Sequence, residues 1–473
     1  MSQCSFPSAC YRRSTTLLDI RHPVTRRHND LPPWLAMKKT RVADTRPSTL
    51  LVKLGDTAVG TITQLGGFDR NLFAFDAAYL ADAQRPTLSL SFLDVEGQPR
   101  ITEQLTRSKV PPFFSNLLPE GMLREYLVER TGIPSEKEFL LLWMVGRDLP
   151  GNVIVEDMEG RPSPPLSEYL GGRLSLTANR RAAPLPRFSL AGVQMKFGAG
   201  KHPGNRLSIP ARGLGGDWIV KLPSPQYDSL PDNEYSMMML GKDIGIDVPE
   251  FGLATTKRIE GIPEGFANLD ANAYYVKRFD RTPKSRIHIE DFNQIFGQFP
   301  DQKYGKQSYN AIGKNIFRIL GEADYREFVR RLVFSILVGN MDMHLKNWSV
   351  VYKDGRTPRL SPAYDLVSTI VYPGIDKALP LSFAGTKDAQ QVDEDLLVSF
   401  AAKTEAPRNY VLETATETVR SFKDAWSAKA KDLPLRKEWR EMISARLATL
   451  PIANLGSQET TKKRRRGRPR RGA

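Results

Sequence analysis

The spacing of apolar residues predicts a mixed amino-terminal half followed by a helical carboxy-terminal half. Leu50–Ile62 has the pattern of two short strands around a Gly-Asp turn. Other short apolar runs bounded by turn residues predict strands at 73–75, 88–93, 152–156, 217–223 and 272–281, and helices are expected at 121–131, 138–145 and from Pro231 onward. From Ile289, apolar residues recur at spacings of three and four, which predicts helices at 290–296, 308–320, 325–338, 394–400, 410–431 and 436–450.

Two carboxylates and one amide follow the helix predicted at 325–338. Asn347 lies five residues after Asp342, and Asp365 lies eighteen residues after Asn347. Phosphoryl transfer uses one carboxylate to orient the attacking hydroxyl, and an amide oxygen and a second carboxylate to hold Mg²⁺ against the nucleotide phosphates. The apolar flanks predict a loop between a buried helix and a strand. A polar loop with a solvated Asp and a capping Asn remains the alternative.

The segments Asn340–Asn347 and Ser361–Ser368 resemble motifs of the HipA family of bacterial serine/threonine kinases, which are the toxins of toxin–antitoxin pairs. The resemblance recurs in several separate motifs between residues 50 and 450. It implies an α/β (α+β) fold of the bilobal protein-kinase-like type, related to the phosphatidylinositol-3-kinase-like kinases. This fold would carry an extra N-terminal α+β subdomain and a largely helical C-lobe.

The same resemblance assigns roles in the active-site loop. Asp342 would orient the acceptor hydroxyl, and Asn347 and Asp365 would hold Mg²⁺. His344 and Lys346 would stabilise charge on the transferred group. ATP would be contacted by a wider set that also includes Lys221, Lys277, Arg278, Phe279, Leu345 and Tyr364.

Small residues followed by a lysine occur in the segment 188–200, where backbone N–H groups could approach phosphates. A plain hairpin turn is the alternative. The segment is similar to the Ser-x-x-Gly-x-Gln-x-Lys loop of HipA proteins, so ATP contacts are implied for Ala191, Gly192, Val193, Gln194, Met195 and Lys196. Ser189 matches the serine that the family autophosphorylates. A phosphate there would place nearly two negative charges beside the nucleotide, and expulsion of the loop would switch the enzyme off.

Lys221 lies on a predicted strand, from which it could grip the α- and β-phosphates, although a solvated edge lysine is the alternative. Asp232 or Asn233 could cap the helix that follows. Glu234 has two competing roles, either as a first-turn carboxylate favoured by the helix dipole or as the partner of Lys221. The Arg-Phe-Asp-Arg match implies that Lys277–Phe279 form the adenine-binding hinge, whereas the next two residues, Asp280 and Arg281, are expected in structural ion pairs.

Two further motifs have less definite roles. Phe113–Gly121 is similar to a segment of the HipA N-terminal subdomain, and we expect this subdomain to be a packing module without chemistry of its own. The loop at 302–305 could meet the substrate. The predicted organisation is a disordered basic leader (1–46), the N-terminal subdomain (47–160), a linker (161–186), the small lobe (187–279), the helical large lobe (280–452) and a basic tail (453–473).

The net charge of +15 is concentrated at the two ends of the 473-residue chain. Lys462–Arg471 contains eight basic residues and no acid, and the leader, in which Met37 could be the true start, contains nine basic against three acidic residues. The rest is close to neutral. Within the tail, Arg466, Gly467, Arg468 and Pro469 resemble the core of an AT-hook, which binds the minor groove of A·T-rich DNA. A nonspecific polybasic tail is the alternative.

Composition restricts the remaining classes of protein. The only cysteines are Cys4 and Cys10, which form neither a disulfide framework nor a metal-site pattern, so a reducing cytoplasm fits. The five histidines are scattered, which disfavours a histidine metal site. The chain contains no apolar run of eighteen residues, so no membrane span is expected.

The sequence therefore predicts a serine/threonine protein kinase that uses ATP and Mg²⁺. The resemblance implies a toxin that inhibits growth and translation by phosphorylating a protein such as an aminoacyl-tRNA synthetase. Its partner would be a HipB-like helix-turn-helix antitoxin, and DNA would be reached through that partner and the tail, which would make the complex nucleoid-associated. The alternatives are a DNA-associated transcriptional corepressor with a vestigial kinase site, and a small-molecule kinase, because the Asp-x-His-x-x-Asn loop also fits lipid kinases.

Overall fold

The computed structural model describes residues 48–66, 70–100, 103–162, 194–209, 216–262 and 270–456. Several predictions lie outside these ranges. They concern the leader, most of the linker, Ser189, Ala191, Gly192, Val193 and the AT-hook-like residues Arg466–Pro469.

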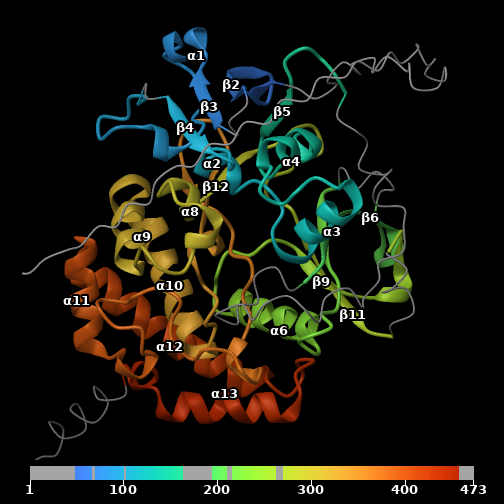
Figure 1. The fold of residues 1–473 in the computed structure, drawn as a ribbon. Coiled ribbons are helices and arrows are strands. Elements are labelled where there is room, and N and C mark those ends of the chain that lie inside the picture. Colours follow the sequence, from blue (N-terminus) through green and yellow to red (C-terminus); the bar gives the residue numbers. More distant parts are fainter. Residues whose placement is uncertain are drawn as a thin grey trace, which may run out of the picture. The chain divides into compact units, whose positions relative to one another are not determined.

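The N-terminal subdomain is built on an antiparallel five-stranded sheet (Figure 1). The strand order is β4 (Gln104–Arg107), β3 (Arg70–Phe75), β2 (Thr57–Leu65), β1 (Thr49–Leu54) and β5 (Val153–Asp157). Its helices are α1 (Ala77–Ala81), α2 (Pro112–Ser115), α3 (Gly121–Thr131) and α4 (Glu138–Val145). Buried aromatic rings such as Phe73, Phe114 and Phe139 fill the core between them, which is the packing expected of a sheet with one apolar face.

The strand predicted at 88–93 is wrong. The chain there forms a short 3-10 turn, Leu90–Phe92, in which the hydroxyl of Ser89 accepts a hydrogen bond from the backbone N–H of Ser91. The buried carboxylate of Glu290 accepts hydrogen bonds from the Ser89 hydroxyl and the Leu90 backbone N–H. A partner 200 residues away therefore satisfies the backbone that a strand ladder would have used.

The small lobe contains a six-stranded sheet with one long helix against it (Figure 1). The order is β10 (Ile259–Glu260), β7 (Arg206–Ser208), β6 (Lys196–His202), β8 (Trp218–Lys221), β11 (Asn272–Lys277) and β9 (Phe251–Thr255), with α6 (Leu230–Asp243) packed on β11 and β9. The prediction that Asp232 or Asn233 caps α6 is wrong, because the helix begins after Ser229 without a side-chain cap. The Asp232 carboxylate instead accepts from the Asn272 amide, and the Asn233 amide donates to the Ser368 carbonyl.

The large lobe is mostly helical, as the apolar spacing predicts. A three-stranded sheet of β12 (His288–Asp291), β13 (Ser349–Tyr352) and β14 (Arg359–Leu360) accompanies α8 (Phe292–Ile295), α9 (Tyr309–Asn315), α10 (Glu322–Val338), α11 (Glu394–Thr404), α12 (Arg408–Lys429) and α13 (Lys437–Thr449). Helix α10 packs on α12 (Figure 1). Almost all residues in the second half of α10 are buried. One predicted helix, 290–296, starts too early, because Glu290 lies in β12 and Asp291 caps α8 with a capping box.

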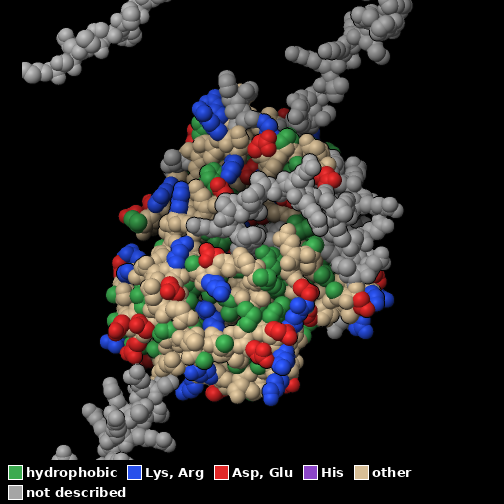
Figure 2. Space-filling model, turned by 60° about the horizontal axis from the view of Figure 1, so that its bottom comes forward, with side chains coloured by type: hydrophobic (Ala, Val, Ile, Leu, Met, Phe, Trp, Pro, Cys, Tyr) green, Lys and Arg blue, Asp and Glu red, His purple; other side chains and the backbone are tan. Residues whose placement is uncertain are grey.

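The surface charges agree with the near-neutral composition of the central part of the chain. On the face drawn in Figure 2, Lys and Arg side chains of the described residues are interspersed with Asp and Glu side chains. None of the helices in the described ranges is both long enough and apolar enough to cross a membrane.

Candidate functional site

The loop that carries Asp342 begins where α10 ends. Gly339 has a φ of +74°, and a Cβ atom there would lie 2.6 Å from the side chain of Ile370, so the sharp exit from α10 requires glycine. The Asn340 amide oxygen accepts from the Asp342 backbone N–H at 3.1 Å, and its amide nitrogen donates to the Asp365 carbonyl at 3.2 Å. One side chain therefore joins the two halves of the predicted motif.

The Asp342 carboxylate is buried and has a defined partner. Its Oδ1 accepts a hydrogen bond from the Tyr304 hydroxyl at 2.8 Å, and Tyr304 also packs edge-on against the ring of His344. The Asn347 amide nitrogen donates to the Asp342 backbone carbonyl at 2.8 Å. This contact leaves the Asn347 amide oxygen as the atom that can face a metal ion.

Asp365 lies beside Lys221. It adopts the left-handed backbone conformation with a φ of +55°, which is uncommon for a residue other than glycine and is found at functional sites. Its carboxylate forms an ion pair with the Lys221 ammonium. Burial raises the pKa of Asp365, but the positive charges of Lys221 and Lys196 outweigh burial and lower it to about 2. The carboxylate is therefore ionised, as a metal ligand must be.

Lys221 is also paired with Glu234, which answers the question that the sequence left open for Glu234. The Lys221 Nζ to Glu234 Oε1 distance is 2.6 Å, and both side chains are buried. Burial raises the pKa of Glu234 to about 7 despite the attraction of Lys221. A strand lysine paired with a helix glutamate is a recurring part of protein kinases, where it places the lysine on the nucleotide phosphates.

The described end of the predicted nucleotide loop lies next to Lys221. Lys196 is the direct cross-strand neighbour of Lys221 in the β6–β8 pair, and residues opposite each other in an antiparallel pair share a face. The Gln194 amide donates to the Leu222 carbonyl at 2.8 Å, and the Met195 carbonyl accepts from the Leu222 N–H at 2.9 Å. The two lysines thus present positive charge on the face of the sheet that Asp365 contacts through Lys221.

The predicted hinge residues are tightly bonded within the protein. The backbone N–H groups of Lys277 and Arg278 donate to the Glu250 and Asp217 carbonyls, each at 2.7 Å. Arg278 and Arg281 both pair with Asp280, whose carboxylate also accepts from the Gly151 N–H, so the expected structural ion pairs are present. The rings of Phe279 and Tyr364 lie 5.8 Å apart, and both residues are among the expected ATP contacts. Contact with adenine stays a prediction.

His344 is a buried imidazole. Neither ring nitrogen has a hydrogen-bond partner among the described residues. Burial, reinforced by Lys303 and Lys346, lowers the pKa of His344 well below its usual value. The imidazole is therefore neutral at physiological pH, so it could act as a hydrogen-bond donor rather than as a cation toward a transferred phosphoryl group.

Lys346 is engaged by the N-terminal subdomain. Its ammonium donates to the Asn116 backbone carbonyl at 3.0 Å and side-chain oxygen at 2.9 Å, and lies 3.1 Å from Glu120 and 3.3 Å from Asp291. These four contacts direct the Lys346 ammonium toward the N-terminal subdomain and Asp291 of β12. The sequence analysis gave neither Asn116 nor Glu120 a role at the site. The available signal was their place in the family-like segment Phe113–Gly121.

The potential metal site consists of few protein ligands. In the described part of the chain, no cluster of three or more His, Cys, Asp or Glu side chains could hold a metal ion. Asn347 and Asp365 supply an amide oxygen and a half-buried carboxylate. Mg²⁺ commonly takes one or two protein oxygens and completes its shell with water and phosphate, so the two residues fit Mg²⁺ bound together with a nucleotide.

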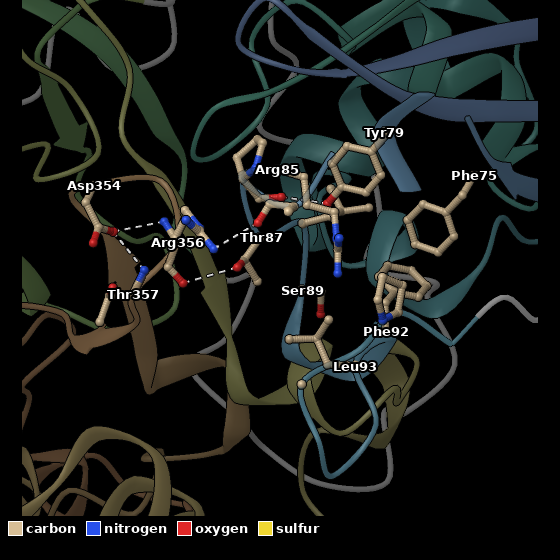
Figure 3. A pocket seen from close by; sticks show the side chains of 15 residues that line it. Phe75, Tyr79, Arg85, Thr87, Ser89, Phe92, Leu93, Asp354, Arg356 and Thr357 are labelled. Atoms are coloured by element: carbon tan, nitrogen blue, oxygen red, sulfur yellow. Dashed lines mark hydrogen bonds between the residues drawn. The ribbon is translucent and has the colours of Figure 1, made fainter. Parts of the chain in front are cut away.

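A cavity of about 330 Å³ lies elsewhere, between the N-terminal subdomain and the β13–β14 turn (Figure 3). It is lined by aromatic side chains that include Phe75 and Tyr79, and by Arg85 and Arg356. The Arg356 guanidinium already bonds to Gln84 and to the Ala83 carbonyl, and Arg85 bonds to backbone carbonyls of its own segment. No residue assigned to nucleotide, metal or acceptor lines this cavity.

Comparison with known proteins identifies the family. Residues 50–156 match the HipA N-terminal domain, and residues 188–426 match the HipA-like C-terminal domain. A Sinorhizobium fredii protein named "Putative kinase Y4dM" is 47% identical over 407 residues, covering 86% of this chain and 98% of the relative. The chain belongs to the HipA family.

Two further comparisons, both with Shewanella oneidensis HipA, are more distant in sequence. The serine/threonine-protein kinase toxin HipA of Shewanella oneidensis is 25% identical over 413 residues, covering 80% of this chain and 88% of the toxin. The solved complex of Shewanella oneidensis HipA with HipB and operator DNA contains a chain that superimposes with a TM-score of 0.66 at 21% identity, covering 86% of this chain and 96% of that one. This likeness confirms the predicted bilobal kinase-like fold.

Proposed function

We propose that this protein is a serine/threonine protein kinase that transfers the γ-phosphate of ATP. The proposal rests mainly on one observation, the ion-paired group of Lys221, Glu234 and Asp365 next to the loop of Asp342 and Asn347. These are the groups that phosphoryl transfer needs, from two lobes, in one region of the fold. The kinase names of the family relatives support the same activity.

Each residue has a proposed role in this reaction. Lys221, held by Glu234, would bind the α- and β-phosphates. Asn347 and Asp365 would hold Mg²⁺, which would neutralise charge on the phosphates. The Asp342 carboxylate would accept the proton of the acceptor hydroxyl, while Tyr304 keeps that carboxylate oriented. Catalysis would come mainly from positioning and preorganised charge.

The proposed wider role is that of a toxin. The Shewanella oneidensis relative is named a toxin, and a Shewanella oneidensis HipA was solved in complex with HipB and operator DNA. We propose a HipB-like helix-turn-helix antitoxin as partner, DNA contact through that partner and through Arg466–Pro469, and action in the cytoplasm on a protein such as an aminoacyl-tRNA synthetase. Ser189 would be the autophosphorylation site that switches the enzyme off. The domain boundaries given above belong to this proposal.

The test is phosphorylation by the purified full chain. Incubation with Mg²⁺ and γ-labelled ATP, followed by phosphosite mapping, should label Ser189 in the parent. Asp342→Asn should lower the rate about 10³-fold, which is typical of the loss of a general base, without changing the melting temperature by more than a few degrees. Asp424→Asn, at an exposed position of α12, is the matched control and should keep full activity. A folded Asp342→Asn protein with parental activity would refute the assignment, and an unlabelled parent that binds no ATP would favour the corepressor alternative.

A further inference from the structure

We infer that the segment Asn116–Glu120 of the N-terminal subdomain is a positioning element of the active site, which holds the Asp342–Asn347 loop in its working conformation through Lys346 and Lys303. This inference rests on the proposed kinase function. It replaces the expectation that the N-terminal subdomain is only a packing module, because the subdomain supplies side chains that reach the loop directly.

Glu120 bridges two lysines on different segments of the large lobe. Its Oε2 lies 2.6 Å from the Lys303 ammonium, and its Oε1 lies 3.1 Å from the Lys346 ammonium. Each lysine is adjacent in sequence to a residue with a proposed role at the reaction centre, either orienting Asp342 or binding the metal ion. Tyr304, which follows Lys303, donates to Asp342, and Asn347, which follows Lys346, is a proposed metal ligand. The Glu120 carboxylate thus pairs with both lysines that directly precede Tyr304 and Asn347.

Helix geometry does not account for Glu120. It occupies the N-cap position of α3, where Ser, Thr, Asp or Asn would be preferred because their short side chains bond the first free N–H groups. The Glu120 side chain makes no such bond to its own helix. Its carboxylate is instead committed to the two lysines, so the residue serves the loop rather than α3.

Asn116, at the start of the same segment, is hydrogen-bonded to three residues of the large lobe. Its amide nitrogen donates to the Gln298 carbonyl at 2.7 Å, while its oxygen accepts from the Asn293 amide and from Lys346, both at 2.9 Å. The Gln294 amide donates to the Phe113 carbonyl at 3.0 Å, and α2 packs against α8. Because the segment is bonded to α8 and to Lys346 together, it cannot shift without moving the loop.

The charges in this cluster balance. Two carboxylates, Glu120 and Asp291, face two ammonium groups, Lys303 and Lys346. Burial raises the pKa of Glu120, but Lys346 and Lys303 outweigh burial and hold it far below its usual range, so the carboxylate stays ionised. Removal of this one charge would leave Lys303 without its ion-pair partner, and Lys346 with Asp291 as its carboxylate partner beside the two Asn116 oxygens. The Lys346 stem, and the backbone that carries Asn347, would then be held less firmly.

The experiment compares Glu120→Gln with the parent full chain. In phosphorylation assays, kcat should fall about 10²-fold, the usual result of an ångström-scale misplacement, while KM for ATP stays within about twofold. Glu120→Asp, which keeps the charge, should recover part of kcat. Glu156→Gln, which removes the half-buried pair with Lys53 in the same subdomain, is the matched control and should behave as the parent. Unchanged kcat in a folded Glu120→Gln protein would overturn the inference.

A second measurement does not depend on catalysis and separates this inference from the kinase proposal. Limited acetylation followed by mass spectrometry measures how accessible each lysine is. Lys346 and Lys303 should be protected in the parent and in Glu156→Gln, and should be modified several-fold faster in Glu120→Gln at equal melting temperature. Equal modification in all three proteins would overturn the positioning role. An inactive parent that still shows the difference would refute the kinase function and leave the positioning contact established.

Discussion

Two lysines that are largely removed from solvent, one from each lobe, are placed between carboxylates, but their surroundings differ. Lys221 lies between Glu234 and Asp365, whereas Lys346 lies between Glu120 and Asp291 and is also bonded twice to Asn116. One partner of Lys221 is a proposed metal ligand, which a bound cation could attract away. The partners of Lys346 have no other proposed ligand. We infer that Lys221 can lose Asp365 to a bound metal ion, whereas Lys346 keeps its ion pairs with Glu120 and Asp291.

The largest expected contrast comes from removal of each lysine. Lys221→Met should lower phosphoryl transfer about 10³-fold, because a preorganised positive charge on the phosphates is lost. Its stability cost should be small, because Glu234, with a pKa of about 7, can take up a proton. Lys346→Met should cost about 3 kcal/mol of unfolding free energy, because the largely enclosed carboxylates of Glu120 and Asp291 are left with one cation fewer.

Urea unfolding and steady-state kinetics on both variants check this contrast. The comparison fails if Lys221→Met is the less stable protein. It also fails if Lys346→Met unfolds with the midpoint of the parent.

A smaller expected effect is that Glu234, beside Lys221, and Glu120, beside Lys346, make the folding stability depend on pH in opposite ways. The pKa of Glu234 is raised in the folded state, so between about pH 4.5 and 7 the native protein holds a proton that the unfolded chain has lost, and this group makes stability fall as pH rises. The pKa of Glu120 is lowered, so its contribution is present above about pH 4.5 and is lost as pH falls below that value.

Unfolding free energies from urea titrations across about pH 3–8 test these opposite signs. Relative to the parent, Glu234→Gln should gain stability as pH rises from 5 to 7. Glu120→Gln should be destabilised at pH 7 and should approach the parent as the solution is acidified. The same sign of pH dependence for both variants would contradict the comparison.

The smallest expected effect concerns Tyr304, which directly follows Lys303 in the chain. Tyr304→Phe removes one hydrogen bond to Asp342 and keeps the ring against His344. Since such a bond contributes about 0.5–1.5 kcal/mol, kcat should fall about three- to tenfold with KM for ATP unchanged. Tyr410→Phe, whose ring packs on Arg326 away from the site, serves as the control in the same kinetic assay. A loss as large as that of Asp342→Asn would mean that Tyr304 does more than orient the carboxylate.

Local pattern was sufficient for much of the fold. The helices at 121–131 and 138–145 begin and end where apolar residues and following glycines predict, and the strands around Gly55 follow from alternation and a turn signal. Predictions failed at Leu88–Leu93 and at Glu290. These two regions satisfy each other's polar groups across the fold, and no local signal announces such a partner.

The sequence by itself determined which chemical groups are available, because Asp342, Asn347 and Asp365 along one stretch supply the groups that we propose for phosphoryl transfer. It also determined the class of fold. Only the tertiary structure decided which partners the lysines take. Glu120 and Lys346 are more than two hundred residues apart in the chain, and Lys221 and Asp365 more than one hundred, so their pairing depends on how the subdomains pack. Burial then makes these distant ion pairs costly to break, since a charge removed from water must be matched by an opposite charge nearby.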